Sequence, residues 1–223
     1  DHPNTRICFA GDLIDRGPDS RSVVQYVIDN NHDCVQGNHE QMMVDWNGSY
    51  GDMLWIGNGG DICLDSYREN KKNIAEEIGG YLKGEINQKV FDDHRFWMDG
   101  LPIVIEYPDC KTPDGRHLVV SHSICHNYWK ALKGNDESRA EHAATQIPWN
   151  RSFHNIKDAG FFNVIGHTPD ERNPHIKTIY ANIDTGAFCG YGGWKRFKKG
   201  GLGYLTALHV PTMTIYQQEC IDD

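Results

Sequence analysis

The sequence lacks the features that mark several common classes of protein. No apolar run approaches the ~18 residues needed to cross a membrane, and no segment resembles a secretory signal peptide. Internal repeats and low-complexity linkers are also missing. An excess of positive charge is missing, since 22 Lys and Arg face 31 Asp and Glu, and a net charge of −9 would repel the phosphate backbone of nucleic acids. We therefore expect neither a membrane nor a nucleic acid as a partner.

Signals for disulfide or thiolate-metal pairing are missing as well. The seven cysteines are an odd number and include no Cys-x-x-Cys pair, which is typical of free thiols in a reducing compartment. We therefore expect a cytoplasmic protein. Hydrophobic residues make up 39% of the 223 residues, enough for a sizeable core. The length predicts one domain over residues 1–223.

Short apolar runs bounded by turn residues dominate what is present. They predict strands at 5–10, 103–107, 117–121, 163–165, 178–183, 204–210 and 212–217, and a short strand that ends at Gly37. Helical spacing predicts helices from Pro18 to about Asn30, over 40–45, and in a helical insertion at roughly 61–98. The pattern predicts an α/β fold in which two mixed β-sheets pack as a sandwich with flanking helices.

Four of the apolar runs end in a side chain that can bind a metal ion. RICFAGD ends in Asp12, DCVQGN in Asn38, HLVVSH in His122 and FFNVIGH in His167. In open α/β sheets, ligand groups project from the loops beyond the carboxyl ends of the strands, so these side chains can converge. Oxygen and imidazole ligands suit manganese, iron or zinc. These four residues are therefore the predicted metal ligands.

The residues around these positions resemble the motifs of a known superfamily. The chain reads Gly11-Asp12-Leu13-Ile14-Asp15-Arg16-Gly17, Gly37-Asn38-His39-Glu40, Ser121-His122 and Gly166-His167-Thr168-Pro169, in that order. It continues to match at Gln41-Met42-Met43, Trp149-Asn150-Arg151 and Ile183-Asp184-Thr185-Gly186-Ala187. This resembles the calcineurin-like metallophosphoesterases, within them the serine/threonine phosphoprotein phosphatases, and especially the small phage and bacterial (bacteriophage lambda phosphatase-like) members.

The resemblance implies a metal-dependent phosphomonoesterase that uses a hydroxide activated by two divalent metal ions. A protein serine/threonine phosphatase is the leading expectation, with a phosphorylated protein or a small phosphoester as substrate. Asp12 corresponds to the carboxylate that bridges both metals, and Asn38, His122 and His167 to the other ligands of one of them. Mn²⁺ is the expected metal, with Fe, Zn or Ni as alternatives. Paired cations offset the repulsion between an anionic nucleophile and an anionic ester.

The resemblance also implies roles for residues that do not bind the metal. His39 corresponds to the general acid that protonates the leaving alkoxide, and Asp15 to the carboxylate that accepts a hydrogen bond from its imidazole. Arg16 and Arg151 correspond to two arginines that bind phosphate oxygens, and we expect Asn38 to contact the phosphate as well. We interpret Asp184 as an organiser of the loop beneath the site.

The chain departs from the family pattern in two places. The family carries an Asp-x-His-Gly motif upstream of the Gly-Asp-x-x-Asp-Arg-Gly segment, but only eleven residues precede Asp12 here. We therefore expect that the chain is truncated at its N-terminus, that one metal site keeps only Asp12, and that the chain as given is nearly inactive. Gln36 also stands where related phosphatases usually carry arginine, which weakens the positive field at the site.

Other functions stay open. A dinucleoside polyphosphate hydrolase or a cyclic phosphodiesterase belongs to the same superfamily, and a non-catalytic pseudophosphatase would explain the missing motif. The stretch from Cys110 to Arg116 has the Cys-x5-Arg spacing of thiol phosphatases, although Pro113-Asp114-Gly115 is typical of a hairpin turn. The basic and aromatic cluster at 194–199 is a further candidate for the substrate cleft.

Overall fold

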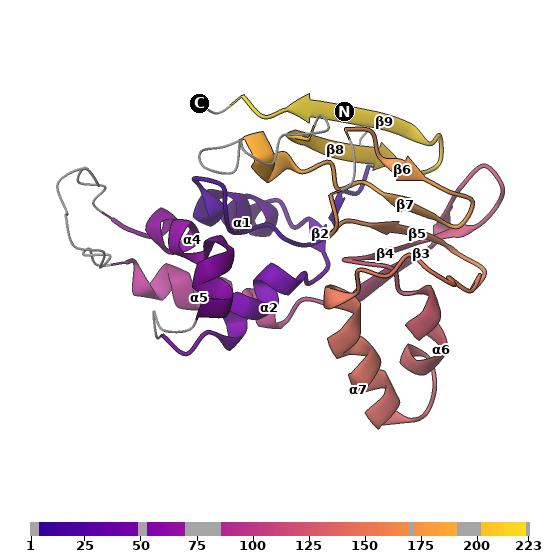
Figure 1. The fold of residues 1–223 in the computed structure, drawn as a ribbon, viewed down its shortest axis with the longest axis horizontal. Helices are drawn as coiled ribbons and strands as arrows, with labels where there is room; N and C mark the ends of the chain where they lie inside the picture. The colour runs from indigo at the N-terminus through magenta and orange to yellow at the C-terminus, as the bar shows by residue number, and fades with distance from the viewer. Residues whose placement is uncertain (1–4, 49–52, 70–85, 170–171, 191–201, 222–223) are drawn as a thin grey trace.

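A five-stranded mixed sheet forms the centre of the computed structural model, which describes residues 5–48, 53–69, 86–169, 172–190 and 202–221. Its strands are β3 (Val104–Lys111), β4 (His117–Ser121), β5 (Phe162–Ile165), β6 (His175–Ile176) and β7 (Tyr180–Asn182), in the order β3-β4-β5-β7-β6 (Figure 1). The three inner strands are parallel, and β3 and β6 pair with them in the antiparallel sense. Every residue of β5 is buried, as expected for a parallel strand covered on both faces.

Two strand pairs cover one face of this sheet. The first joins β1 (Cys8–Phe9) and β2 (Asp33–Cys34) in parallel, and the second joins β8 (Tyr204–His209) and β9 (Thr214–Glu219) as an antiparallel hairpin. Side chains from both layers meet in one buried cluster that includes Val35, Val120, Val164 and Val210. The predicted sandwich is confirmed, with the second layer formed in the described residues by two separate strand pairs.

Five helices pack together beside the sandwich, on the left of Figure 1. They are α1 (Ser20–Asp29), α2 (Asn38–Asp45), α3 (Met53–Trp55), α4 (Asp61–Ser66) and α5 (Gln88–Asp99). Their core contains Val24, Met43, Trp55, Leu64 and Phe91. The predicted helical insertion at 61–98 thus contains α4 and α5, while residues 70–85 lie outside the described part. The helical region starts earlier than predicted, at Met53.

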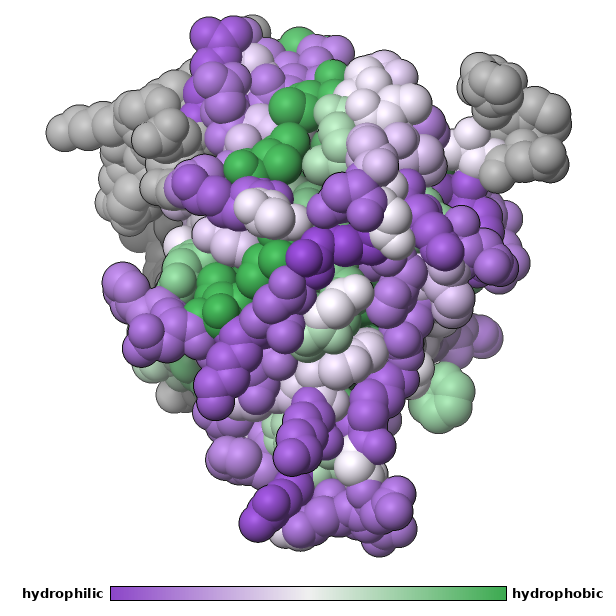
Figure 2. All heavy atoms as spheres, turned by 90° about the vertical axis from the view of Figure 1, so that its right-hand side faces the viewer, coloured by the Kyte–Doolittle hydropathy of each residue, from purple (hydrophilic) through white to green (hydrophobic). Residues whose placement is uncertain are grey.

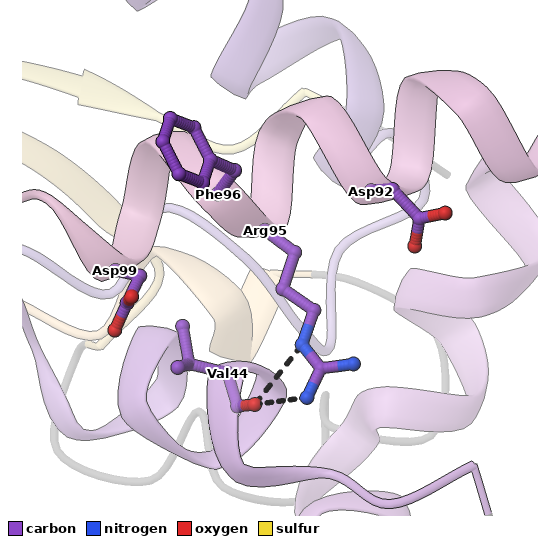
Figure 3. Close-up of a pocket in the computed structure, with 5 residues that line it drawn as sticks. All are labelled: Val44, Asp92, Arg95, Phe96 and Asp99. Carbon is purple, nitrogen blue, oxygen red and sulfur yellow. Dashed lines mark hydrogen bonds between the residues drawn. The ribbon is translucent and has the colours of Figure 1, made fainter.

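Helix α5 holds the C-terminal end of α2. Arg95 donates from Nε to the carbonyl of Val44 over 3.0 Å, and its Nη2 donates to the same oxygen (Figure 3). The last carbonyls of a helix have no partner within the helix, so this contact satisfies a group that would otherwise need water. The contact matters for the site because the N-terminal end of α2 carries Asn38 and His39.

The other face of the central sheet is covered by α6 (Trp129–Leu132) and α7 (Glu137–Gln146), which the sequence did not predict. The reason is that α7 buries only Ala143, so its sequence has no apolar stripe. The surface at the bottom of Figure 2, where these helices lie, is accordingly mostly hydrophilic. None of the helices in the described ranges has the length and apolar character required to cross a lipid bilayer. All seven cysteines are free thiols.

Candidate active site

The four predicted ligand residues lie at one end of the sandwich, just beyond the strands that precede them. Asp12 follows β1, Asn38 begins α2 after β2, His122 follows β4, and His167 follows β5. Gly11 makes their approach possible. It has φ +82°, and a Cβ there would lie 2.7 Å from the Gly37 nitrogen and 2.9 Å from His122 Nδ1. Only glycine combines that conformation with so close a contact.

The ligand atoms of these residues converge on His122. Its Nε2 lies 3.0 Å from His167 Nδ1, 3.2 Å from Asn38 Oδ1 and 3.3 Å from Asp12 Oδ1. One ligand atom from each of Asp12, His122 and His167 lies within 4.8 Å of the others. The structure therefore brings all four side chains together. Their role as metal ligands stays a prediction.

The chemistry of this cluster fits a divalent cation. His122 Nδ1–H donates to the Ala10 carbonyl over 2.6 Å, so Nε2 is the ring nitrogen that faces the cluster and can bind a cation once it has lost its proton. Such a second hydrogen bond fixes the tautomer of metal-binding histidines. Although burial opposes the shift, the Asp12 carboxylate raises the pKa of His122 to about 9, whereas burial and the charge of His122 lower the pKa of His167 to about 3. The cluster thus favours positive charge at its centre. Repulsion between the two rings opposes the protonation of both His122 and His167.

His39 and Asp15 form a buried pair beside this cluster. His39 Nδ1 donates to Asp15 Oδ2, and the two side chains are 4% and 0% exposed. Burial opposes protonation of His39, but the charges of Asp12 and Asp15 and the bond to Asp15 raise its pKa above the ordinary value. The pair therefore has the geometry predicted for a general acid and its carboxylate partner, while its catalytic role is untested.

Arg16 reaches His39 from the other side. Its Nη2 lies 2.9 Å from His39 Nε2, and its Nε donates to the Asn58 carbonyl over 3.2 Å. Because a guanidinium only donates, Nε2 is the acceptor in this arrangement. The guanidinium also lies 4.5 Å from the centre of the Phe188 ring. Arg16 is thus held in place by backbone, imidazole and aromatic contacts.

A cleft of about 200 Å³ unites these groups. It is lined by Asp12, Arg16, Asn38, His39, Arg151, His167, Pro169 and Phe188. Arg151 is exposed on the segment after the 3₁₀ turn Ile147–Trp149. The cleft therefore contains both predicted arginines, the predicted acid and three of the four predicted ligands.

Glu40 is a site residue whose function the sequence analysis missed. It is fully buried, and its Oε2 accepts the N–H groups of Asp12 and Gly37, both over 2.8 Å. Its Oε1 accepts the N–H of Leu13 over 2.6 Å. Glu40 therefore ties the loop of Asp12 to the loop of Asn38. Its place in Gly-Asn-His-Glu was the available signal.

The structure also shows the surroundings of three other positions that the sequence analysis singled out. Gln36 does not line the cleft, because its amide donates to the Met98 carbonyl of α5 over 2.8 Å. Asp184 accepts the N–H of Gly186 over 3.0 Å, a loop-organising contact. The thiol phosphatase alternative is wrong, since Cys110 and Arg116 belong to the β3–β4 hairpin and a strand, not a helix, follows the arginine. The cluster at 194–199 lies outside the described residues.

Comparisons with known proteins agree with this architecture. No family model matches the chain. The chain is 49% identical over 51 residues to serine/threonine-protein phosphatase 1 of Salmonella typhimurium, which covers 23% of this chain and 24% of that protein. The matched part thus spans about a quarter of the relative's length. A crystal structure of a protein provisionally described as a diadenosine tetraphosphatase superposes with a TM-score of 0.56 at 15% identity, over 96% of this chain and 80% of that one. At this identity the likeness shows the fold, which is metallophosphoesterase-like.

Proposed function

We propose that the protein is a metal-dependent phosphoesterase that hydrolyses phosphomonoesters, with phosphorylated serine or threonine side chains as its main substrates. One observation carries the proposal. His39 and Arg16 line the same cleft as Asp12, Asn38 and His167 of the ligand cluster. The buried Asp15 and His122 contact these residues from within the protein. A proton donor and phosphate-binding groups beside a metal cluster are what hydrolysis of an unreactive ester requires.

Asp12, Asn38, His122 and His167 would hold the metal. When bound, divalent cations supply charge neutralisation for the phosphate ester and a water of lowered pKa. Two oxygen and two imidazole ligands suit Mn²⁺, the expected ion, and also Fe or Zn. The resemblance implies a second ion that shares Asp12.

The remaining residues would bind the substrate and move a proton. Arg16 and Arg151 offer planar donors to phosphate oxygens, and the Asn38 side-chain amide lies beside them in the cleft. When Arg16 turns to the phosphate, its Nη2 leaves His39 Nε2, which can then take up a proton from water and later deliver it to the leaving oxygen. Asp15 stays on Nδ1 and stabilises the imidazolium that this step requires.

A dinucleoside polyphosphate hydrolase is the second candidate. It is favoured by the superposition with the protein provisionally described as a diadenosine tetraphosphatase. The segment of 49% identity to a protein phosphatase favours the first candidate. We propose in addition that the protein is cytoplasmic and acts without a nucleic acid or a membrane as partner. The free thiols are consistent with a reducing compartment.

A substrate panel tests the proposal on protein expressed from the complete reading frame. After chelation and addition of Mn²⁺, we expect hydrolysis of p-nitrophenyl phosphate and a phosphoserine peptide, and slower hydrolysis of diadenosine tetraphosphate. Asp12→Asn should lower kcat by more than about 100-fold, while Asp109→Asn, at an exposed position of β3, should have no effect. Faster cleavage of the dinucleotide would favour the second candidate. Binding without hydrolysis of any ester would favour a non-catalytic binding module.

A further inference from the structure

Trp55 contacts the carboxylate that holds the proposed acid. Its indole Nε1–H lies 3.0 Å from Asp15 Oδ1 and 3.1 Å from Oδ2, so it donates to the carboxylate edge. The Asp15 backbone N–H donates to Ser20 Oγ over 3.1 Å. His39 Nδ1–H donates to Oδ2 of the same carboxylate. The orientation of the carboxylate is therefore set by two donors, the indole and the imidazole.

The indole itself has little freedom to move. Trp55 is 1% exposed, and its ring centre lies 5.0 Å from that of Trp46 and 6.3 Å from that of Phe91. The backbone of the π-helical turn Ile56–Gly60 packs against the indole. It comes so close that a Cβ on Gly60 would lie 2.6 Å from the ring. Gly60 has an ordinary φ of −63°, so glycine is needed there for space rather than for conformation.

We propose that Trp55 is a positioning residue of the site, which fixes Asp15 in the orientation that keeps His39 aimed at the leaving group. The inference rests on the proposed function and extends it to a residue 40 positions away from Asp15. Without the indole N–H, the carboxylate can rotate, and the imidazole loses its fixed direction. Attack at phosphorus does not use His39. The defect should therefore be confined to substrates whose leaving group needs a proton.

Two pairs of variants test this inference. Trp55→Phe removes the N–H and keeps an aromatic ring, and Trp46→Phe makes the same change in the same cluster without removing a donor to Asp15. Gly60→Ala adds a methyl group that clashes with the indole ring and must displace it. Gly57→Ala is the control, because its methyl group would contact only the Met53 methyl, at 3.9 Å. We expect Trp55→Phe and Gly60→Ala to lower kcat on a phosphoserine peptide by about 10- to 100-fold, with little change on p-nitrophenyl phosphate or in KM. The controls should retain activity on both.

Two further measurements separate positioning from general damage. In a His39→Asn background, Trp55→Phe should cause no additional loss, because its effect passes through His39. In proton NMR of the unliganded protein, the His39 Nδ1–H should give a downfield resonance that shifts or disappears in Trp55→Phe and persists in Trp46→Phe. This resonance can be followed whether or not the protein hydrolyses any ester, so it tests the inference apart from the proposed function.

Defined outcomes would overturn the inference. Equal losses on both substrates, additive losses with His39→Asn, or an unchanged His39 resonance in folded Trp55→Phe would each show that Trp55 only fills space. If Trp55→Phe does not fold, the comparison of Gly60→Ala with Gly57→Ala carries the test. An unchanged leaving-group dependence in folded Gly60→Ala would then refute it.

Discussion

Glu40→Gln is the most direct test of how the site loops are held. The Glu40 carboxylate accepts three backbone N–H groups, from Asp12, Leu13 and Gly37, and is fully buried. Glutamine has the same shape but only one acceptor oxygen. If that oxygen takes the place of Oε2, the amide nitrogen faces the Leu13 N–H, which lies 2.6 Å from Oε1 in the native protein.

The size of the effect follows from these contacts. One buried donor left without an acceptor costs about 1–3 kcal/mol, and the two remaining bonds lose their ionic partner at about 1 kcal/mol each. Relief of the repulsion between Glu40 and the Asp12 carboxylate offsets part of this loss. We therefore expect Glu40→Gln to lower the free energy of unfolding by about 2–4 kcal/mol.

Urea denaturation at neutral pH measures this change. The control is Glu69→Gln, because Glu69 is exposed and its oxygen accepts a single bond, from Asn87 Nδ2 over 2.7 Å, which glutamine can also accept. It should change stability by less than about 0.5 kcal/mol. Burial and the charge of Asp12 raise the pKa of Glu40, so a protonated Glu40 is the competing description. Equal stability of Glu40→Gln and Glu69→Gln would favour that description and refute the reasoning.

Three further predictions concern the site and the helical region. Calorimetric titration with Mn²⁺ should show weaker binding to His122→Gln than to wild type by at least about 10-fold, and equal affinities would exclude His122 as a ligand. His39→Asn should lower kcat on a phosphoserine peptide about 10²–10⁴-fold and far less on p-nitrophenyl phosphate, and equal losses would make His39 structural. Burial lowers the pKa of His94 below its ordinary 6.5, so its contribution to stability is complete above pH 6.5 and is lost as the pH falls through the lower folded value. Urea midpoints of wild type should drop between pH 7 and about pH 5, and drop less in His94→Gln.

The sequence predicted the parts of the fold that follow from local pattern. The strand His117–Ser121 was predicted with its observed bounds, and the alternating Tyr204–His209 within one residue. Both are runs whose burial is regular along the chain, so periodicity describes them. The same reasoning failed for α7, because ten residues that bury one alanine carry no periodic signal.

The candidate site also contains residues that the sequence predicts and residues whose contacts it does not. The four ligand side chains could be found because each ends an apolar run, and strand order brings such ends together. Trp55 and Glu40 could not be assigned their contacts, since their partners lie 40 and 28 positions away and belong to other elements. A tryptophan in an apolar segment predicts burial, but not which carboxylate its N–H will meet.

Backbone conformation explains why these distant contacts gather around residues 11–16. Among the described residues, seven other than glycine have positive φ, and four of them, Asp12, Asp15, Arg16 and His167, belong to the site. Each such residue costs about 1–3 kcal/mol and persists only where surrounding contacts hold it.

The holding contacts come from the helical region. Glu40 binds the N–H of Asp12, Trp55 binds the Asp15 carboxylate, and the carbonyls of Asn58 and Gly59 accept from Arg16. A Cβ at Gly59 would lie 2.8 Å from Arg16 Cγ, so this turn also needs glycine to reach the loop. The helices between β2 and β3 therefore do more than cover an apolar face. They hold a strained loop in the one conformation that points Asp12 and Arg16 into the cleft and Asp15 at the imidazole of His39.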